Sequence, residues 1–289
     1  MPLITPPTQG FGQIDVSDFV INGTNATVAL GDSVMNALIK RTVSGASNVT
    51  INVTDPYRTV LQSGIFVYGS NMTVDGLEFT AVQMTKASDT IQMIFEAKYV
   101  AALRQQKGLQ VTSQSVDLPG FVATLVAQVP GLGFISEQTP LASAVSIGRG
   151  TTNDPNEDSW TCIQRVATSA GWRCFEVNGT IFLGSDQFFL QVASQGTLIE
   201  KTQFIQNIDF DIDIGKPAGN ATVTGITQNW GYPPGAVVWM SGMGPGDGQP
   251  WLVQDCQRDL FHPQMTATLY VPMTPQEVVL GRPTAAPFS

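Results

Sequence analysis

The segment that most constrains the fold of this chain is residues 158–186, DSWTCIQRVATSAGWRCFEVNGTIFLGSD. Its first half carries apolar residues at helical spacing, which predicts a helix over 159–170. The residues that set this spacing are Trp160, Ile163 and Ala167. Asp158 or Ser159 can cap the start of the helix, and Gly171 can end it, because glycine readily adopts the left-handed conformation found just past many helix ends.

The second half of the segment predicts a β-hairpin. It holds two apolar stretches joined by Asn178-Gly179, and this dipeptide is the strongest short-range signal for a two-residue hairpin turn. The segment therefore predicts a helix, a turn and two antiparallel strands in one small unit.

Two strands are also predicted at 77–84 (LEFTAVQM) and 90–96 (TIQMIFE), because apolar and polar residues alternate in both. We expect them to pair through the polar turn Thr85–Asp89. The residues on their apolar faces are Leu77, Phe79 and Ala81 in the first strand and Ile91, Met93 and Phe95 in the second.

Residues 117–129 (DLPGFVATLVAQV) predict a second helix, which Val129-Pro130-Gly131 ends. Asp117 can cap this helix, and Pro119 lies in its first turn, where proline is tolerated. The apolar residues at helical spacing are Phe121, Val122, Leu125, Val126 and Val129. Residues 148–157 (GRGTTNDPNE) are rich in turn formers and predict a linker before the helix-plus-hairpin unit.

The segment IDFDIDIG places three carboxylates at alternating positions, Asp209, Asp211 and Asp213. In a strand these side chains share one face, and the apolar residues between them share the other. Three interpretations stay open: a solvated face, the wall of a negatively charged channel in an oligomer, or a calcium site. A flat strand by itself does not wrap a cation with six or more oxygens.

Few residues are suited to catalysis. The three cysteines, at 162, 174 and 256, form no Cys-x-x-Cys pair, which argues against a disulfide framework or a structural zinc site and favours a reducing compartment. The one histidine, His262, precedes Pro263, and no Gly-x-Ser-x-Gly elbow is present. We therefore expect His262 to be a solvated or capping turn residue rather than a catalytic base.

Phosphate and nucleic-acid binding are also disfavoured. The loop 242–250 (GMGPGDGQP) lacks the Gly-Lys-Ser/Thr ending of a phosphate loop and precedes a predicted strand, so we expect a plain connection between strands. The net charge is −9, whereas binding to DNA needs a basic surface that releases counterions.

The start of the sequence, MPLITPPTQGFG, has neither the basic segment nor the apolar core of a signal peptide, and no run of about 18 apolar residues occurs anywhere. We expect neither export by a standard signal nor stable membrane insertion. Seven Asn-x-Thr triplets are then expected from turns and strands rather than from glycosylation. They begin at Asn22, Asn25, Asn48, Asn52, Asn71, Asn178 and Asn220.

Large apolar residues supply the candidate structural core. Pro233-Pro234-Gly235 and the tryptophans Trp230, Trp239 and Trp251 are expected to be strand-edge and packing residues of a barrel. A carbohydrate-binding aromatic platform is the functional alternative for these tryptophans, although buried tryptophan is commoner in β cores. The candidate core residues are Trp160, Ile163, Trp172, Trp239 and Trp251.

Four sequence segments that follow one another along the chain carry a family resemblance. Trp-x-x-Ile-Gln-Arg-x-Ala followed by Gly-Trp-Arg-Cys-Phe, within 158–186, resembles the central region of the tail-hub (minor tail, baseplate hub) proteins of long-tailed actinobacterial phages. The segments 41–66 and 72–108, the latter ending on Phe-Glu-x-x-x-Val-Ala-x-Leu-Arg, resemble the first barrel of that family. The stretches within 208–275 are similar to its closing barrel. For 32–42, helical periodicity competes with this resemblance, which favours a strand in the second half, and the choice stays open.

The resemblance implies a mainly β fold with an α+β insert, in which two tail-tube-like β-barrel domains flank a small helix-plus-hairpin connector. The expected parts are a first β-barrel hub domain (1–112), a helical connector and linker (113–155), a small α/β unit (156–196), a second β-barrel hub domain (197–275) and a flexible C-terminal tail (276–289).

The resemblance also implies a structural virion protein at the tail tip, assembled in the host cytoplasm and lining the DNA channel, with no cofactor, bound metal or catalytic residue. Asp209, Asp211 and Asp213 are the candidate channel-lining residues. The implied partners are two further copies in a homotrimer, a distal-tail or tail-tube protein, central fibre or tip proteins, a tape-measure protein, and DNA that passes without specific binding. The alternatives are a tail-associated cell-wall hydrolase and a receptor- or glycan-binding tail adhesin.

Overall fold

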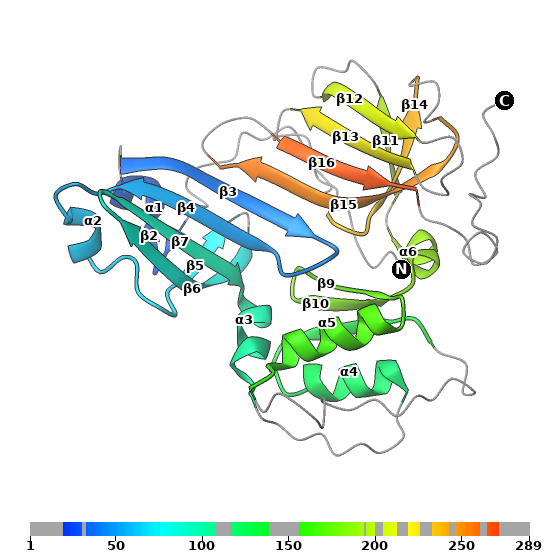
Figure 1. Cartoon of the computed structure of the whole chain (residues 1–289), viewed down its shortest axis with the longest axis horizontal. Coiled ribbons are helices and arrows are strands. Elements are labelled where there is room, and N and C mark those ends of the chain that lie inside the picture. Colours follow the sequence, from blue (N-terminus) through cyan, green and yellow to red (C-terminus); the bar gives the residue numbers. More distant parts are fainter. Residues whose placement is uncertain are drawn as a thin grey trace.

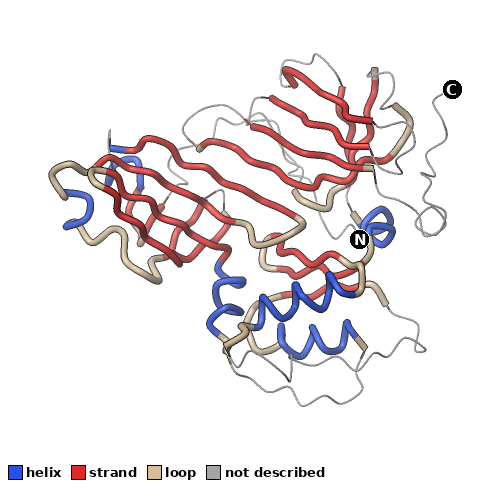
Figure 2. Tube along the Cα trace, in the orientation of Figure 1, coloured by secondary structure: helices blue, strands red, loops and turns tan. Residues whose placement is uncertain are grey.

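The computed structural model describes most of the chain between residues 20 and 271 and combines one large, mainly antiparallel sheet with a small α/β unit (Figure 1). The described ranges are 20–30, 33–74, 76–107, 117–138, 156–193, 195–199, 205–212, 219–225, 233–242, 247–260 and 265–271. Strands dominate both ends of the molecule, and the longer helices gather in the small unit (Figure 2).

The N-terminal half supplies seven strands of the large sheet, with short helices at its ends. These elements are β1 (Val20–Ile21), β2 (Thr24–Asn25), α1 (Ala26–Leu30), β3 (Val34–Thr42), β4 (Asn48–Thr54), α2 (Thr59–Gln62), β5 (Asn71–Val74), β6 (Leu77–Ala87), β7 (Thr90–Ala97) and α3 (Lys98–Gln105).

The C-terminal half supplies the other six strands. They are β11 (Gln195–Ile199), β12 (Ile205–Ile212), β13 (Gly219–Gly225), β14 (Val237–Ser241), β15 (Pro250–Asp259) and β16 (Met265–Tyr270). The two halves form one 13-stranded sheet because β15 pairs with β3, with Gln257 opposite Lys40. The described strands run in the open order β12-β13-β16-β15-β3-β4-β7-β6-β5-β1-β2, and β11 and β14 branch from β15. The fold is therefore mainly antiparallel β, as expected, and the two-barrel arrangement stays a prediction.

Of the ambiguous segment 32–42, residues Val34–Thr42 form a strand, β3, rather than a helix. Ala37 and Ile39 are buried on one face, and neighbours on both sides, β4 and β15, satisfy the backbone hydrogen bonds. Tertiary pairing therefore outweighs the helical periodicity of the segment.

The predicted hairpin of 77–84 and 90–96 is confirmed, but its strands are longer than expected and its turn is shorter. Ala87 pairs with Thr90, so the turn is only Ser88-Asp89, and Ser88 takes a left-handed φ of 51°. The predicted turn Thr85–Asp89 was too long because the ladder with β7 continues to Ala87.

The small α/β unit contains α4 (Leu118–Val126), β8 (Gly133–Ser136), α5 (Ser159–Ser169), β9 (Arg173–Val177), β10 (Thr180–Gly184) and α6 (Asp186–Val192). Its sheet has the order β8-β10-β9, with β8 parallel to β10. The helices α4 and α5 cover one face of this sheet, and the large sheet faces the other (Figure 1).

Both predicted helices of this unit have the expected caps. The Asp117 carboxylate accepts from the Gly120 N–H at 2.9 Å, and the Asp158 carboxylate accepts from the Thr161 N–H at 2.8 Å. After α5, Gly171 takes a left-handed φ of 71°, and the Trp172 N–H donates back to the Ala167 carbonyl. This arrangement of the helix end is the Schellman motif, which a glycine at this position favours.

The predicted hairpin is also present. Val177 pairs with Thr180, and both turn residues, Asn178 and Gly179, have positive φ values of 51° and 75°. A turn with two positive φ values matches the right-handed twist of the flanking strands, which is why Asn-Gly favours it.

Several expectations concern residues outside the described ranges. They are most of the linker 148–157, His262 with Pro263, Trp230, the candidate channel residue Asp213 and the tail 276–289. In the part of the chain that the structure describes, no helix has the length and apolar character that a membrane crossing needs.

Candidate functional site

The acidic segment forms β12, an edge strand that pairs with β13. Asp209 is exposed, and the preceding Ile208 is buried, as strand alternation predicts. The Asn207 side-chain amide donates to Asp209 Oδ2 at 2.8 Å. Two positions further along β12, the backbone of Asp211 pairs with Asn220 of β13. Of the three candidate carboxylates, the structure therefore describes the side chain of Asp209 only.

Asp209 belongs to a larger polar face of the sheet. The strand register aligns it with Thr222 on β13 and, through Thr222, with Thr268 on β16. A neighbouring row of paired residues aligns Gln257 on β15 with Lys40 on β3. This row crosses from one half of the chain to the other. The members of this polar face are Asn207, Asp209, Thr222, Thr224, Thr266, Thr268, Asp255, Gln257, Asp259, Lys40, Asn36, Asn52, Gln92 and Thr85. All of them are exposed or half-buried.

Side-chain amides bond along this face in the N-terminal half. Asn52 donates to Asn36 Oδ1 at 2.7 Å, and Gln92 donates to Asn52 Oδ1 at 3.1 Å. This ladder links β3, β4 and β7 on the side away from their apolar core. Within the polar face, Lys40 is the one cation, and Asp209, Asp255 and Asp259 are the carboxylates. The face is thus polar with a net negative charge, and it offers a phosphate backbone little counterion release.

The polar face outside β12 was not predicted from the sequence. A signal existed, because the strand NVTINVT at 48–54 alternates polar and apolar residues as clearly as the acidic strand does. What the sequence did not show is that β3, β4 and β7 lie in one sheet with β12.

Two polar contacts join the small unit to the two halves of the large sheet. In the first, the guanidinium of Arg41 on β3 donates to Asn178 Oδ1 at 3.2 Å. Beside it, the buried Glu176 carboxylate accepts from the Gly179 N–H at 2.6 Å. Burial lowers the pKa of Arg41 despite the nearby Glu176. Burial together with the neighbouring Arg41 lowers the pKa of Arg258 to about 10.

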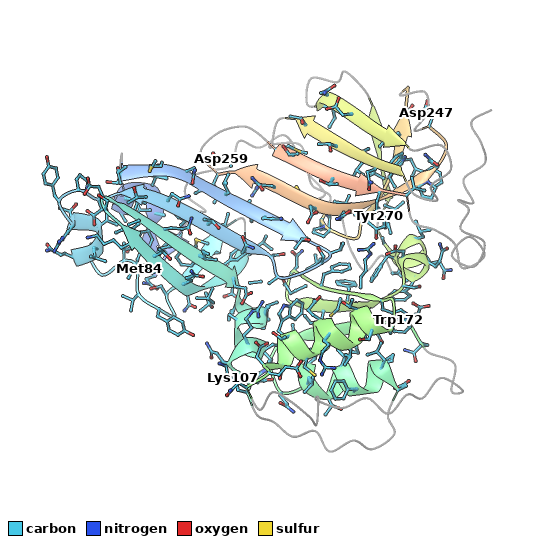
Figure 3. All side chains as sticks on the ribbon, viewed as in Figure 1. Met84, Lys107, Trp172, Asp247, Asp259 and Tyr270 are labelled. Atoms are coloured by element: carbon cyan, nitrogen blue, oxygen red, sulfur yellow. The ribbon has the colours of Figure 1, made fainter. Side chains whose placement is uncertain are left out.

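The second contact joins the small unit to the C-terminal half. The Tyr270 hydroxyl on β16 donates to Asp186 Oδ1 at 2.8 Å, and Asp186 is also ion-paired with Arg173. The Arg173 guanidinium lies over the Tyr270 ring, 4.5 Å from its centroid. Figure 3 shows Tyr270 at the boundary between the large sheet and the small unit. The small unit therefore makes side-chain hydrogen bonds to both halves of the large sheet.

Glu176 predicts a pH dependence of stability. Burial raises its pKa, and the Gly179 hydrogen bond and Arg41 offset this only in part. A carboxyl with a raised folded-state pKa stabilises the fold below its unfolded pKa, about 4.3, and this contribution is lost as the pH rises through the folded-state value. We expect wild type to lose stability relative to Glu176→Gln as the pH rises from about 4 towards neutral.

The measurement is the free energy of unfolding of both proteins in urea at several pH values. Glutamine keeps an oxygen for the Gly179 N–H, so the comparison isolates ionisation. Parallel curves for the two proteins would show that Glu176 does not titrate differently on folding.

The structure places the candidate core residues in different environments. Trp160, Ile163 and Trp251 are 1 %, 0 % and 0 % exposed. Trp172 and Trp239 are half-buried and pack against the edges of two core clusters, and Figure 3 shows Trp172 at the end of α5. The three cysteines are buried free thiols.

The described residues of the glycine-rich segment, Gly242 and 247–249, lie between β14 and β15. Among the residues that the structure describes, no group of three His, Cys, Asp or Glu side chains could hold a metal ion.

No protein-family model and no curated protein sequence matches this chain. Solved structures do match it. A tail protein from Neisseria meningitidis MC58 matches with a TM-score of 0.54 and 11% identity over 81% of this chain and 91% of its own. The prophage tail protein gp18 from Listeria monocytogenes EGD-e matches with a TM-score of 0.53 and 10% identity over 86% of this chain and 93% of its own.

A third match is the E. coli c3393 protein, with a TM-score of 0.57 and 12% identity over 84% of this chain and 74% of its own. It is described as a component of the type VI secretion system with structural similarity to the T4 bacteriophage tail proteins gp27 and gp5. The present chain has the fold of phage tail proteins.

Proposed function

We propose that the chain is a structural virion protein, the hub at the tail tip of a long-tailed phage, and that three copies form a ring around the DNA channel. The observation that carries this proposal is a tail-protein fold with a polar sheet face of net negative charge that spans both halves of the chain. In this role the described residues serve the assembly of the ring and the lining of the DNA channel rather than catalysis.

Fold likeness supports the hub role. The E. coli protein that shares this fold resembles gp27 and gp5 of a phage tail, and the Neisseria and Listeria proteins are tail proteins by description. The sequence segments around Trp160 and Phe95 resemble those of the minor tail, or baseplate hub, proteins of actinobacterial phages. In that family the two β-rich halves would be two tail-tube-like barrels, so three chains would present six barrels.

The polar face supports channel lining. DNA must pass a tail tip without adhering, and each lysine or arginine that contacts phosphate would add affinity through counterion release. On the polar face the hydroxyls and amides stay hydrated, and Asp209 repels phosphate. Asp211 and Asp213 extend this acidic character in our proposal.

The proposed place in the virion defines the partners. The ring would contact a distal-tail or tail-tube protein on one side and central fibre or tip proteins on the other. The tape-measure protein and then DNA would pass through it without specific binding. No cofactor is needed for this role.

Cryo-electron microscopy of tails that contain this chain tests the proposal. We expect three copies in a ring at the tip, with the polar face towards the channel. One copy or six copies would contradict the trimer. A position of Asp209 more than a Debye length, about 8 Å, from the channel wall would contradict its lining role.

DNA ejection tests the acidic lining in the same tails. The triple variant Asp209→Lys, Asp211→Lys, Asp213→Lys should slow ejection, because each ammonium adds a phosphate contact. The matched control replaces the same three residues with asparagine, which removes the negative charge and adds no positive one. Wild-type ejection rates in normally assembled lysine-variant tails would show that these residues do not line the path.

A further inference from the structure

A cavity of about 290 Å³ lies where the small unit meets the N-terminal half of the large sheet. Its lining residues come from β3, the β3–β4 loop, β6, the end of β7, the start of α3 and the β9–β10 hairpin. The volume is close to the lower limit for small-molecule sites, about 300 Å³. None of the lining residues belongs to the polar face, so the cavity is separate from the surface on which the proposed function rests.

Two groups of opposite charge line this cavity without forming an ion pair. Arg41 on β3 and Glu176 on β9 lie near each other, because the charge of each shifts the pKa of the other. The Arg41 guanidinium donates to Asn178 Oδ1, and the Glu176 carboxylate accepts from the Gly179 N–H. Among the described residues, neither side chain has another hydrogen-bond or ion-pair partner. Buried opposite charges normally pair, so a group in this cavity that contacts both is favoured.

The hydrogen bonds that remain open define the ligand. Arg41 uses one of the N–H donors of its guanidinium, and Glu176 keeps its second carboxylate oxygen, Oε2, beyond the Oε1 that binds Gly179. Ser47, which is 4 % exposed and also lines the cavity, adds a hydroxyl without a hydrogen-bond partner. A group that accepts one hydrogen bond and donates another beside it satisfies Arg41 and Glu176 together.

Another part of the lining is apolar. It consists of Leu77 and Phe79 of β6, Ala97 at the end of β7 and Tyr99 on α3. The Tyr99 ring packs against the hairpin turn, since a Cβ atom added to Gly179 would lie 2.9 Å from Tyr99 Cε2. A short hydrocarbon body therefore fits beside the polar groups.

The charges around the cavity favour a neutral ligand. Arg41 and Glu176 balance each other, and the exposed Glu78 is paired with Lys98 at 2.9 Å. An anion in the cavity would lie beside the Glu176 carboxylate, and a cation would lie beside the Arg41 guanidinium. Like charges placed together in a buried site repel strongly, so a ligand of either sign is disfavoured.

We propose that this cavity binds a neutral primary carboxamide with a short apolar stem. The carbonyl oxygen accepts from the Arg41 guanidinium, the amide nitrogen donates to Glu176 Oε2, and the stem packs on the apolar lining. An asparagine or glutamine side chain of a partner chain and a free small amide both present this chemistry. The site does not depend on the hub role proposed above.

Isobutyramide, isobutyrate and isobutyramidinium test this preference, because the three probes share one shape and are neutral, negative and positive. Each is titrated into the isotope-labelled full chain at a pH well above the usual pKa range of carboxyl groups. The backbone N–H of Gly179, which is bonded to Glu176, reports binding by nuclear magnetic resonance. We expect a saturable shift with isobutyramide, and weaker binding of either ion by roughly 10-fold or more.

The variant Glu176→Gln should reverse the preference. Glutamine can keep its oxygen on the Gly179 N–H, so its amide nitrogen faces the cavity and Arg41 loses its balancing charge. Isobutyrate should then bind more tightly than isobutyramide, a change that a merely structural role of Glu176 would not produce. The matched control is Glu157→Gln, whose carboxylate pairs with Arg165 and does not line the cavity, and it should keep the wild-type order.

The wild-type titrations decide the proposal even if the variant does not fold. Absence of a saturable shift with isobutyramide, or an ion that binds the wild type as tightly, overturns the proposal and leaves water as the occupant. An asparagine or glutamine side chain of a neighbouring chain in this cavity, seen in assembled tails, would identify a partner as the source. A small amide released from the denatured chain and detected by mass spectrometry would identify a free ligand.

Discussion

Trp160→Ala should lower the free energy of unfolding by about 3–5 kcal/mol, the range for removing a large buried aromatic side chain. Trp160 lies in the first turn of α5 and is 1 % exposed. It shares a core cluster with Phe121 of α4 and with Cys174 and Ile181 of the β9–β10 hairpin. The cavity left by alanine would lie where α4, α5 and the small sheet meet, and packed elements on every side limit how far it can collapse.

Urea denaturation measures this loss, and Trp172→Ala is the matched control. Trp172 packs against the same cluster but is only half-buried, so its removal should cost clearly less. Equal losses for the two variants would contradict the central position that we assign to Trp160.

Gly235→Ala should destabilise the protein by about 2–5 kcal/mol, because backbone strain of about 1–2 kcal/mol adds to an overpacking cost of about 1–3 kcal/mol. Gly235 has a φ of 79°, and a Cβ atom there would lie 2.4 Å from Cζ of Phe175. The Phe175 ring is fully buried and stacks on Phe182, with centroids 5.7 Å apart. The glycine backbone is held too, because the Gly235 N–H donates to the Val253 carbonyl at 2.8 Å.

Gly242→Ala is the matched control for this prediction. Gly242 has a similar φ, 77°, but no atom lies within 4 Å of its added Cβ, so only the strain of about 1–2 kcal/mol should appear. Calorimetry and urea denaturation of both variants separate strain from overpacking. Equal losses would show that Phe175 can move away and that the small unit is not pressed against the C-terminal half at this point.

The comparisons with known structures show the tail-protein fold, and the sequence phrases suggest a finer placement at the tip. Identities of 10–12% leave the individual surfaces free to differ among these proteins. The polar face therefore follows from this chain's own residues.

Local signals in the sequence determined the small unit well. Asp158 and Asp117 cap helices, Gly171 ends one, and Asn178-Gly179 turns a hairpin, because each of these features depends on residues only a few positions apart. The alternation around Asp209 was likewise enough to predict an exposed carboxylate next to a buried isoleucine.

Only the tertiary structure decided how these parts combine. The segment 34–42 became a strand because β4 and β15 lie on either side of it, and β15 is about 200 residues away in sequence. The polar face exists because hydrogen-bonded registers align Asn36 with Asn52, and Lys40 with Gln257, across the two halves. The fit of Phe175 against Gly235 likewise joins two segments that no local pattern relates. Periodicity within a strand fixes which residues share a face, but pairing between distant strands fixes which faces become one surface.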